Sequence, residues 1–271
     1  MVDCSTFILK DGLFNLYGNL TSLDNYISTY DGGNKYKYMF ENTNVYDCSK
    51  LNTGIKTYNS GMVFLSMFSN CEYLVKVPKL PVTTLASSCY NGMFKGCTLL
   101  TTIPSDLLPA TTLARSCYRG MFSDCTSLTT IPSNLLPATT LADSCYLEMF
   151  SDCTSLTTIP NLPATTLAFG SYRNMFYGCT GLVETPEGWY LPAQTLSDRS
   201  VAYMFSGCYN LQKMAVAYTG TNFETSWEGP WYLWMNNVSS TGTFYYSKNQ
   251  TKENIRSIVP SGWTLVQSTE W

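Results

Sequence analysis

The sequence contains no histidine. Histidine is the side chain whose unperturbed pKa lies nearest neutrality, so its absence excludes Ser-His-Asp and Cys-His sites and most zinc-hydrolase sites. A pair of catalytic carboxylates stays open in principle, but the acidic side chains mostly occupy variable positions of a repeated segment, such as Asp106, Asp124, Asp143 and Asp152. An evolved active site normally breaks a repeat with clustered polar exceptions. The sequence therefore favours a protein that is not an enzyme and that uses no cofactor.

Charged residues are also scarce. They make up 13% of the chain, the formal net charge is -3, and the lysines and arginines do not cluster. Binding to nucleic acid requires a basic patch, so we expect no nucleic-acid partner. No stretch approaches the roughly 20 apolar residues of a membrane-spanning helix, and residues 1–10 lack the basic start and apolar run of a signal peptide. We therefore expect neither membrane insertion nor a leader.

One repeated segment dominates the rest of the sequence. The dipeptide Met-Phe recurs at intervals of 26 to 29 residues, and its copies begin at Met39, Met67, Met93, Met121, Met149, Met175 and Met204. A fixed period in this range is typical of a solenoid, in which each repeat buries its apolar side only against its neighbours. The sequence therefore predicts an α/β solenoid of about seven repeats that presents a surface to a partner.

Each repeat is expected to contain a strand, an outer arc and a short helix. Residues 127–132 are short, β-branched and closed by proline, which is typical of a strand in a parallel sheet. The next Thr-Thr-Leu segment, at residues 139–141, suggests a second short strand on another face. The spacing i, i+4, i+5 and i+8 of Cys145, Met149, Phe150 and Cys153 predicts a helix of about two turns.

Eleven cysteines raise the question of disulfides or a metal site. Nine of them keep a fixed distance from Met-Phe: Cys71, Cys97, Cys125, Cys153, Cys179 and Cys208 follow it, and Cys89, Cys117 and Cys145 precede it. The spacing within one copy matches no usual zinc site. One cysteine per copy at one position suits a buried ladder of small apolar side chains. The sequence therefore favours free, buried thiols over disulfides and predicts no metal site.

Two sets of residues are candidate binding sites. The first is an array of threonine pairs in the predicted strands, of which at least one member must point outward: Thr101, Thr102, Thr129, Thr130, Thr157 and Thr158. The sequence favours an ordinary exposed β-surface here, and the alternative is a polar concave face that contacts a glycan or a protein. The second set is Trp231 and Trp234 in the aromatic tail. A cap that buries these rings is favoured over a sugar-binding platform.

Both ends of the chain differ from the middle, as the capping of a repeat array requires. Residues 1–35 lack the repeat and are predicted to form an N-terminal cap or an attachment segment. Residues 36–214 carry the repeats. Residues 215–271 are predicted to form an aromatic C-terminal cap.

The pattern Met-Phe-x-x-Cys-x-x-Leu-x-x-Ile-Pro occurs at residues 121–132 and again at 149–160. It resembles the BspA-like leucine-rich repeats, whose usual turn carries Ala-Phe-x-x-Cys-x-x-Leu-x-x-Ile before a proline. The resemblance covers roughly residues 36–214 and implies a leucine-rich-repeat solenoid. Because the shared positions belong to the core, it transfers no binding residue. The longer turn with Cys-Tyr-x-x-Met-Phe is similar to copies found in Bacteroidales and in their phages and prophages.

The resemblance implies adhesion. The expected protein is a non-enzymatic binding module, either a phage fibre or decoration protein or a bacterial surface adhesin, which contacts a cell-surface glycan or protein. The missing leader favours the virion, where residues 1–35 would dock the chain, in a homo-trimer. A purely structural virion component that contacts other virion proteins, and an intracellular protein-interaction scaffold, are the alternatives.

Overall fold

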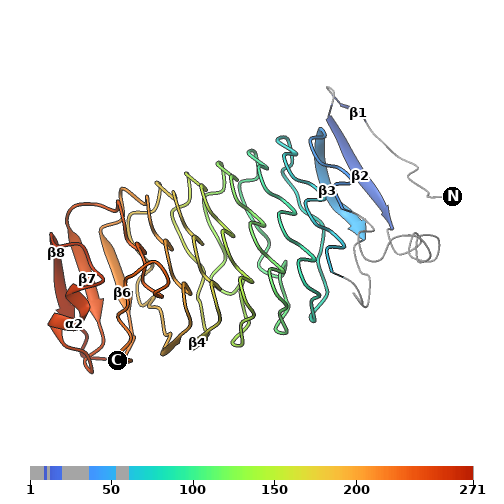
Figure 1. Ribbon diagram of the computed structural model, residues 1–271. Helices are drawn as coiled ribbons and strands as arrows, with labels where there is room; N and C mark the ends of the chain where they lie inside the picture. Colours follow the sequence, from blue (N-terminus) through green and yellow to red (C-terminus); the bar gives the residue numbers. More distant parts are fainter. Residues whose placement is uncertain (1–8, 11–12, 20–36, 53–60, 271) are drawn as a thin grey trace.

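The computed structural model describes residues 9–10, 13–19, 37–52 and 61–270. The regular secondary structure of the described residues is mostly short strands in largely parallel sheets. Successive copies of the repeat lie one beside the next along an elongated molecule (Figure 1). This arrangement is compatible with a repeat-type solenoid. Most of the predicted N-terminal segment, as well as Cys4, lies outside the described residues.

Two small sheets include the first five strands. Strand β1 (Leu9–Lys10) pairs antiparallel with β2 (Leu13–Asn19), and β2 pairs in parallel with β3 (Val45–Asn52). Strand β4 (Thr166–Leu167) pairs in parallel with β5 (Thr195–Leu196). Strand β4 lies in the Thr-Thr-Leu segment of its copy and β5 lies in the equivalent Gln-Thr-Leu segment, so the second short strand is confirmed at this point of the array.

A third sheet lies at the C-terminal end of the molecule (Figure 1). It is parallel and consists of β6 (Lys213–Val216), β7 (Gly242–Tyr246) and β8 (Trp263–Gln267). The helix α2 (Lys252–Arg256) lies between β7 and β8 in the chain, and it is the single α-helix among the described residues. The structure therefore has fewer helices than the predicted α/β solenoid.

Pairing between the middle copies consists of parallel bridges of single residues. Thr102 pairs with Thr130 in the predicted strand, and Thr140 pairs with Thr166 in the Thr-Thr-Leu segment. In the predicted strand, proline stands two positions after the bridged threonine. Because proline has no N–H, it ends the ladder of hydrogen bonds. The copies thus keep a parallel register although the strands are shorter than the sequence predicts.

The predicted helix around Met149 is wrong. Within residues 61–270, the Cys-Tyr-x-x-Met-Phe-x-x-Cys segments contain no α-helix and form a run of successive turns, called here the turn ribbon. Every fourth residue has a positive φ, as at Ser144 (+54°), Glu148 (+59°) and Asp152 (+58°). A right-handed helix cannot continue through such residues.

The hydrogen bonds of the turn ribbon alternate between its own copy and the next. The N–H of Met149 donates to the oxygen of Tyr146, three residues back, at 3.2 Å, whereas the N–H of Phe150 donates to the oxygen of Met175 in the next copy at 2.9 Å. Left-handed dihedrals cost roughly 1–2 kcal/mol per non-glycine residue. The bonds between copies offset this cost, so the ribbon is stabilised by stacking rather than by local propensity.

Columns of identical side chains fill the interior. The phenylalanine of each Met-Phe pair stacks on its equivalents, and the Phe122 ring centroid lies 5.6 Å from those of Phe94 and Phe150. A parallel column of tyrosines includes Tyr118 and Tyr146, whose centroids are 5.9 Å apart. Each copy therefore buries its rings against its two neighbours, as the repeat predicts.

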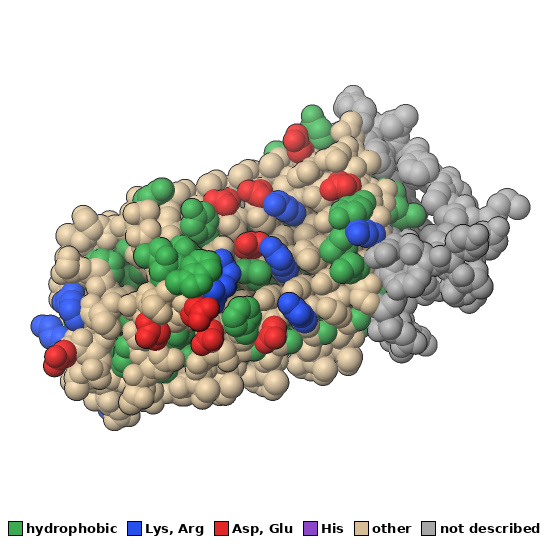
Figure 2. All heavy atoms as spheres, in the orientation of Figure 1, with side chains coloured by type: hydrophobic (Ala, Val, Ile, Leu, Met, Phe, Trp, Pro, Cys, Tyr) green, Lys and Arg blue, Asp and Glu red, His purple; other side chains and the backbone are tan. Residues whose placement is uncertain are grey.

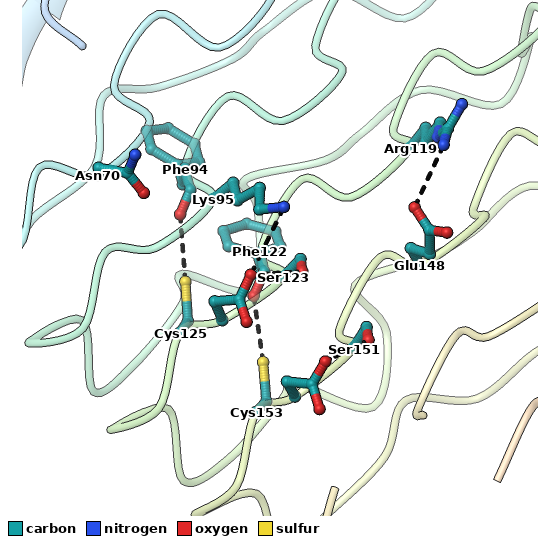
Figure 3. A network of polar contacts seen from close by, with 12 residues as sticks. Asn70, Phe94, Lys95, Arg119, Phe122, Ser123, Cys125, Glu148, Ser151 and Cys153 are labelled. Atoms are coloured by element: carbon teal, nitrogen blue, oxygen red, sulfur yellow. Dashed lines mark hydrogen bonds and ion pairs between the residues drawn. The ribbon is translucent and has the colours of Figure 1, made fainter. Parts of the chain in front are cut away.

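The ten described cysteines are free and buried, which confirms that they belong to the core. The Cys125 thiol donates to the Phe94 oxygen at 3.2 Å, and the Cys153 thiol donates to the Phe122 oxygen at 3.1 Å (Figure 3). These two thiols thus contact the backbone of the preceding copy. A weak S–H donor of this size fills the space under the neighbouring copy and satisfies a carbonyl at the same time.

Candidate binding surface

The structure places the six predicted threonines on the surface, and they are called here the threonine track. Five are exposed, and Thr158 is half-buried. Thr102 and Thr130 occupy equivalent positions of neighbouring copies, and the N–H of Thr157 donates to the oxygen of Thr129 at 2.9 Å. Since neighbouring strands lie about 4.8 Å apart, the track is an in-register array with a regular spacing.

Several hydroxyls of the track take part in the stacking of the copies. Thr157 donates its hydroxyl to the oxygen of Thr129 at 3.0 Å, and the Thr158 hydroxyl accepts from the N–H of Ile131 at 3.1 Å. A hydroxyl that donates along the stack keeps lone pairs that can accept from a ligand. The track therefore offers fixed oxygen acceptors on a backbone that does not need to rearrange.

Paired charges lie beyond both ends of the threonine track. At one end Lys76 lies 3.2 Å from Asp47, and at the other Lys213 lies 3.7 Å from Glu184; each pair joins bridged residues of neighbouring copies. Burial raises the pKa of Asp47, but hydrogen bonds from Ser49 and the Lys76 ammonium outweigh it and leave the pKa below its usual value. In each pair the two charges compensate each other, and the threonines between the pairs carry no charge.

Trp231 and Trp234 were candidate residues of a sugar-binding platform, and the structure shows that they cannot form one. Trp231 is 1% exposed and Trp234 is 2% exposed, and their ring centroids are 4.9 Å apart. Trp234 also donates through Nε1 to the oxygen of Ile258 at 2.6 Å. A platform needs an accessible ring face, and neither residue has one. They are core residues, in agreement with the favoured alternative of a tail that buries its rings.

The two tryptophans are buried because they continue the turn ribbon. The N–H of Phe205 donates to the oxygen of Trp234 at 2.8 Å, and Leu233 and Asn237 have positive φ at the ribbon's spacing of four residues. Trp234-Met235 therefore replaces Met-Phe in one further copy of the ribbon, within the segment assigned to the C-terminal cap.

A different tryptophan is exposed. Trp227 is 55% exposed, and the Arg199 guanidinium lies 4.1 Å from its ring centroid. The Tyr232 ring packs against it in a T-shaped arrangement, with the ring centroids 5.9 Å apart. The sequence gives one signal for this difference, because Trp227 precedes the ribbon copy whereas the buried tryptophans lie within it. A cation–π contact of this kind fixes the ring but already covers one of its faces.

Figure 2 shows a face on which acidic, basic and hydrophobic side chains lie close together. Many of the charges on the turn ribbon pair across copies, for example Lys95 with Asp124 at 3.6 Å and Arg119 with Glu148 at 3.4 Å (Figure 3). These exposed pairs contribute little to stability. They do, however, cancel opposite charges along the stack.

The described residues offer neither a metal site nor a membrane-spanning helix. Among them, no three or more histidine, cysteine, aspartate or glutamate side chains group together in a way that could hold a metal ion. No helix in the described part of the chain has the length and apolar character needed to cross a membrane.

No family model, no curated protein and no solved structure matches this chain. The resemblance to BspA-like repeats therefore depends on the motifs at residues 121–132 and 149–160 and stays a prediction.

Proposed function

We propose that the chain is a leucine-rich-repeat solenoid of about seven repeats that acts as a non-enzymatic binding module and contacts a glycan or a protein on a cell surface. The threonine track is the observation that supports this most directly. Five of its six side chains are exposed, and all six are uncharged and held in register by the backbone of Thr102, Thr129 and their equivalents. A ligand that binds such a rigid array orders few protein side chains, which lowers the entropic cost of binding.

The proposed setting is a phage virion, as a fibre or decoration protein, or the surface of a bacterium of the Bacteroidales type. In the virion, residues 1–35 would dock the chain, in a homo-trimer. Lys76 and Lys213 are paired with Asp47 and Glu184, so they add no net positive charge beside the track. Because nucleic acid binds to net positive charge, this pairing supports an uncharged partner instead.

A purely structural virion component is the second candidate. The observation that favours it is the use of the Thr157 and Thr158 hydroxyls within the stack, which by itself gives the threonines a structural role. In this case the partners are other virion proteins, and the purified chain does not bind cells.

The substitution Thr130→Glu tests the binding role. It places a charge at the centre of the neutral track, and we expect it to lower binding of the labelled protein to encapsulated Bacteroidales cells at least tenfold. Thr140→Glu is the matched control, because Thr140 is also an exposed, bridged threonine but lies in the Thr-Thr-Leu segment, outside the threonine track. Circular dichroism and thermal unfolding would establish that both variants fold. Equal cell binding by the two variants would contradict a role for the threonine track.

A further inference from the structure

A pocket of about 470 Å³ lies next to the Glu184–Lys213 end of the threonine track. Residues 185–190 form one wall, residues 267–270 form another, and residues of β6, β7 and β8 form the floor. The volume falls in the range of roughly 300–1,000 Å³ that is common for small-molecule sites. The pocket is thus large enough for a ligand of one or two rings.

Sheet register determines which side chains form the floor. Ala215 pairs with Tyr245, and Tyr245 pairs with Val266, so the three residues form one row across the sheet. Their chain neighbours Met214 and Phe244 are fully buried in the core. Because side chains alternate along a strand, the row lies on the face of the sheet opposite to Met214 and Phe244, where Ala215 is buried and Tyr245 and Val266 are half-buried.

The first wall is held in place by the core. Trp189 is buried and donates through Nε1 to the oxygen of Pro160 at 2.9 Å, and the N–H of Leu191 donates to the oxygen of Ala215 at 3.2 Å. Gly188 has a φ of +72°, which glycine adopts without strain. Tyr190, two residues after Gly188, lines the pocket and is 39% exposed.

The polar lining contains more negative than positive charge. Glu187 and Glu270 contribute carboxylates, and Lys213 contributes an ammonium that already lies 3.7 Å from the Glu184 carboxylate. An acidic ligand would be repelled by this set. A neutral, hydroxyl-rich ligand would find acceptors for its O–H groups in the two carboxylates.

We propose that this pocket binds one sugar residue of a neutral glycan, and that the glycan chain continues along the threonine track. The tyrosine rings of Tyr190 and Tyr245 supply apolar faces for the C–H side of a sugar ring, while the carboxylates accept from its hydroxyls. The inference rests on the proposed function, since it names the ligand class of the same surface. Lys213 belongs to both the pocket and the ion pair beside the track, which makes the two surfaces continuous.

Saturation-transfer NMR with the full chain tests the pocket. The probes are glucose, galactose, mannose, fucose and N-acetylglucosamine, with glucuronic acid and N-acetylneuraminic acid as charged counterparts. We expect at least one neutral sugar to bind and the acidic sugars to bind at least tenfold more weakly. The absence of binding by every neutral sugar, or a preference for the acidic ones, would overturn the proposal.

Variants of the floor locate the binding. Tyr245→Ala should weaken the affinity for the bound sugar at least tenfold, whereas Tyr245→Phe, which keeps the ring, should stay within about threefold of the original chain. Tyr209→Ala is the matched control, since Tyr209 is 61% exposed and lies outside the pocket lining. Equal loss in Tyr245→Ala and Tyr209→Ala, or no loss in either, would place the sugar elsewhere.

The same variants separate this inference from the proposed function. If Tyr245→Ala binds encapsulated cells as well as the original chain while Thr130→Glu does not, the pocket proposal is wrong and the binding role of the track stands. If the original chain binds no cells but the pocket binds a sugar, the sugar site stands and the proposed cell-surface role is wrong.

Discussion

Raising the pH of a reduced solution from 7 to 9 is expected to lower the free energy of unfolding by several kcal/mol. The ten described cysteines are buried, and burial raises the pKa of each thiol, to about 12 for Cys117 and for Cys208. In the unfolded chain a thiol ionises with a pKa of about 8.5. Ionisation therefore favours the unfolded state as soon as the pH approaches that value.

The sign follows from the raised pKa values. A group whose pKa is higher in the folded state contributes its full stability below the unfolded pKa and loses it as the pH rises toward the folded pKa. At pH 9 the loss is on the order of 1 kcal/mol for a thiol that stays protonated in the folded chain. Ten thiols add up to an amount comparable with the whole stability of a typical domain, about 5–15 kcal/mol. The chain should therefore unfold in mild alkali.

Urea unfolding at pH 7, 8 and 9 in the presence of a reductant measures this effect. Cys117→Ser is the informative variant, because Ser171 and Ser200 already occupy equivalent buried positions in later copies, so a serine fits there. It should reduce the pH dependence by about a tenth. The same free energy of unfolding at pH 7 and pH 9 would contradict the burial of the thiols.

The substitution Phe122→Ala is expected to lower the free energy of unfolding by about 3–5 kcal/mol. The Phe122 side chain is fully buried, and its ring stacks on Phe94 and on Phe150 at the same centroid distance of 5.6 Å. In a stack of copies that contact only their neighbours, the loss of one middle ring weakens two interfaces at once.

Two controls accompany this variant in chemical denaturation. Phe122→Leu keeps most of the volume and should cost less than about 1.5 kcal/mol. Phe169→Ala removes a ring that is 43% exposed and should change stability by at most about 0.5 kcal/mol. A cost for Phe122→Ala no larger than that of Phe169→Ala would show that the ring column does not hold the copies together.

The sequence predicted the buried columns correctly but not the conformation that produces them. Buried residues at i, i+4, i+5 and i+8 fit a helix with a period of 3.6 residues, and they also fit a ribbon of turns with a period of four. The distinguishing signal is a residue that tolerates positive φ at every fourth position, as in Ser88, Gly92 and Gly96. Glu148 and Tyr203 occupy the same kind of position and obscure the signal.

The candidate surface was predictable in part. Alternation along the predicted strands was enough to suggest that at least one threonine of each pair points outward, and the structure shows both Thr129 and Thr130 to be exposed. The tryptophans at 231 and 234 were harder, because Trp-Met replaces Met-Phe in their copy and hides the repeat. The pocket could not be predicted, since residues 185–190, three strands and residues 267–270 meet only after the chain has folded.

A saturation-binding isotherm of the labelled, purified chain on an encapsulated Bacteroidales strain and on its acapsular derivative tests the cell-surface role most directly. We expect saturable binding to the encapsulated cells that disappears when the capsule is absent. Equal binding to both strains, or no binding to any strain of a broad panel, would contradict it. The second outcome would favour a structural component of a particle, with the repeats used for assembly.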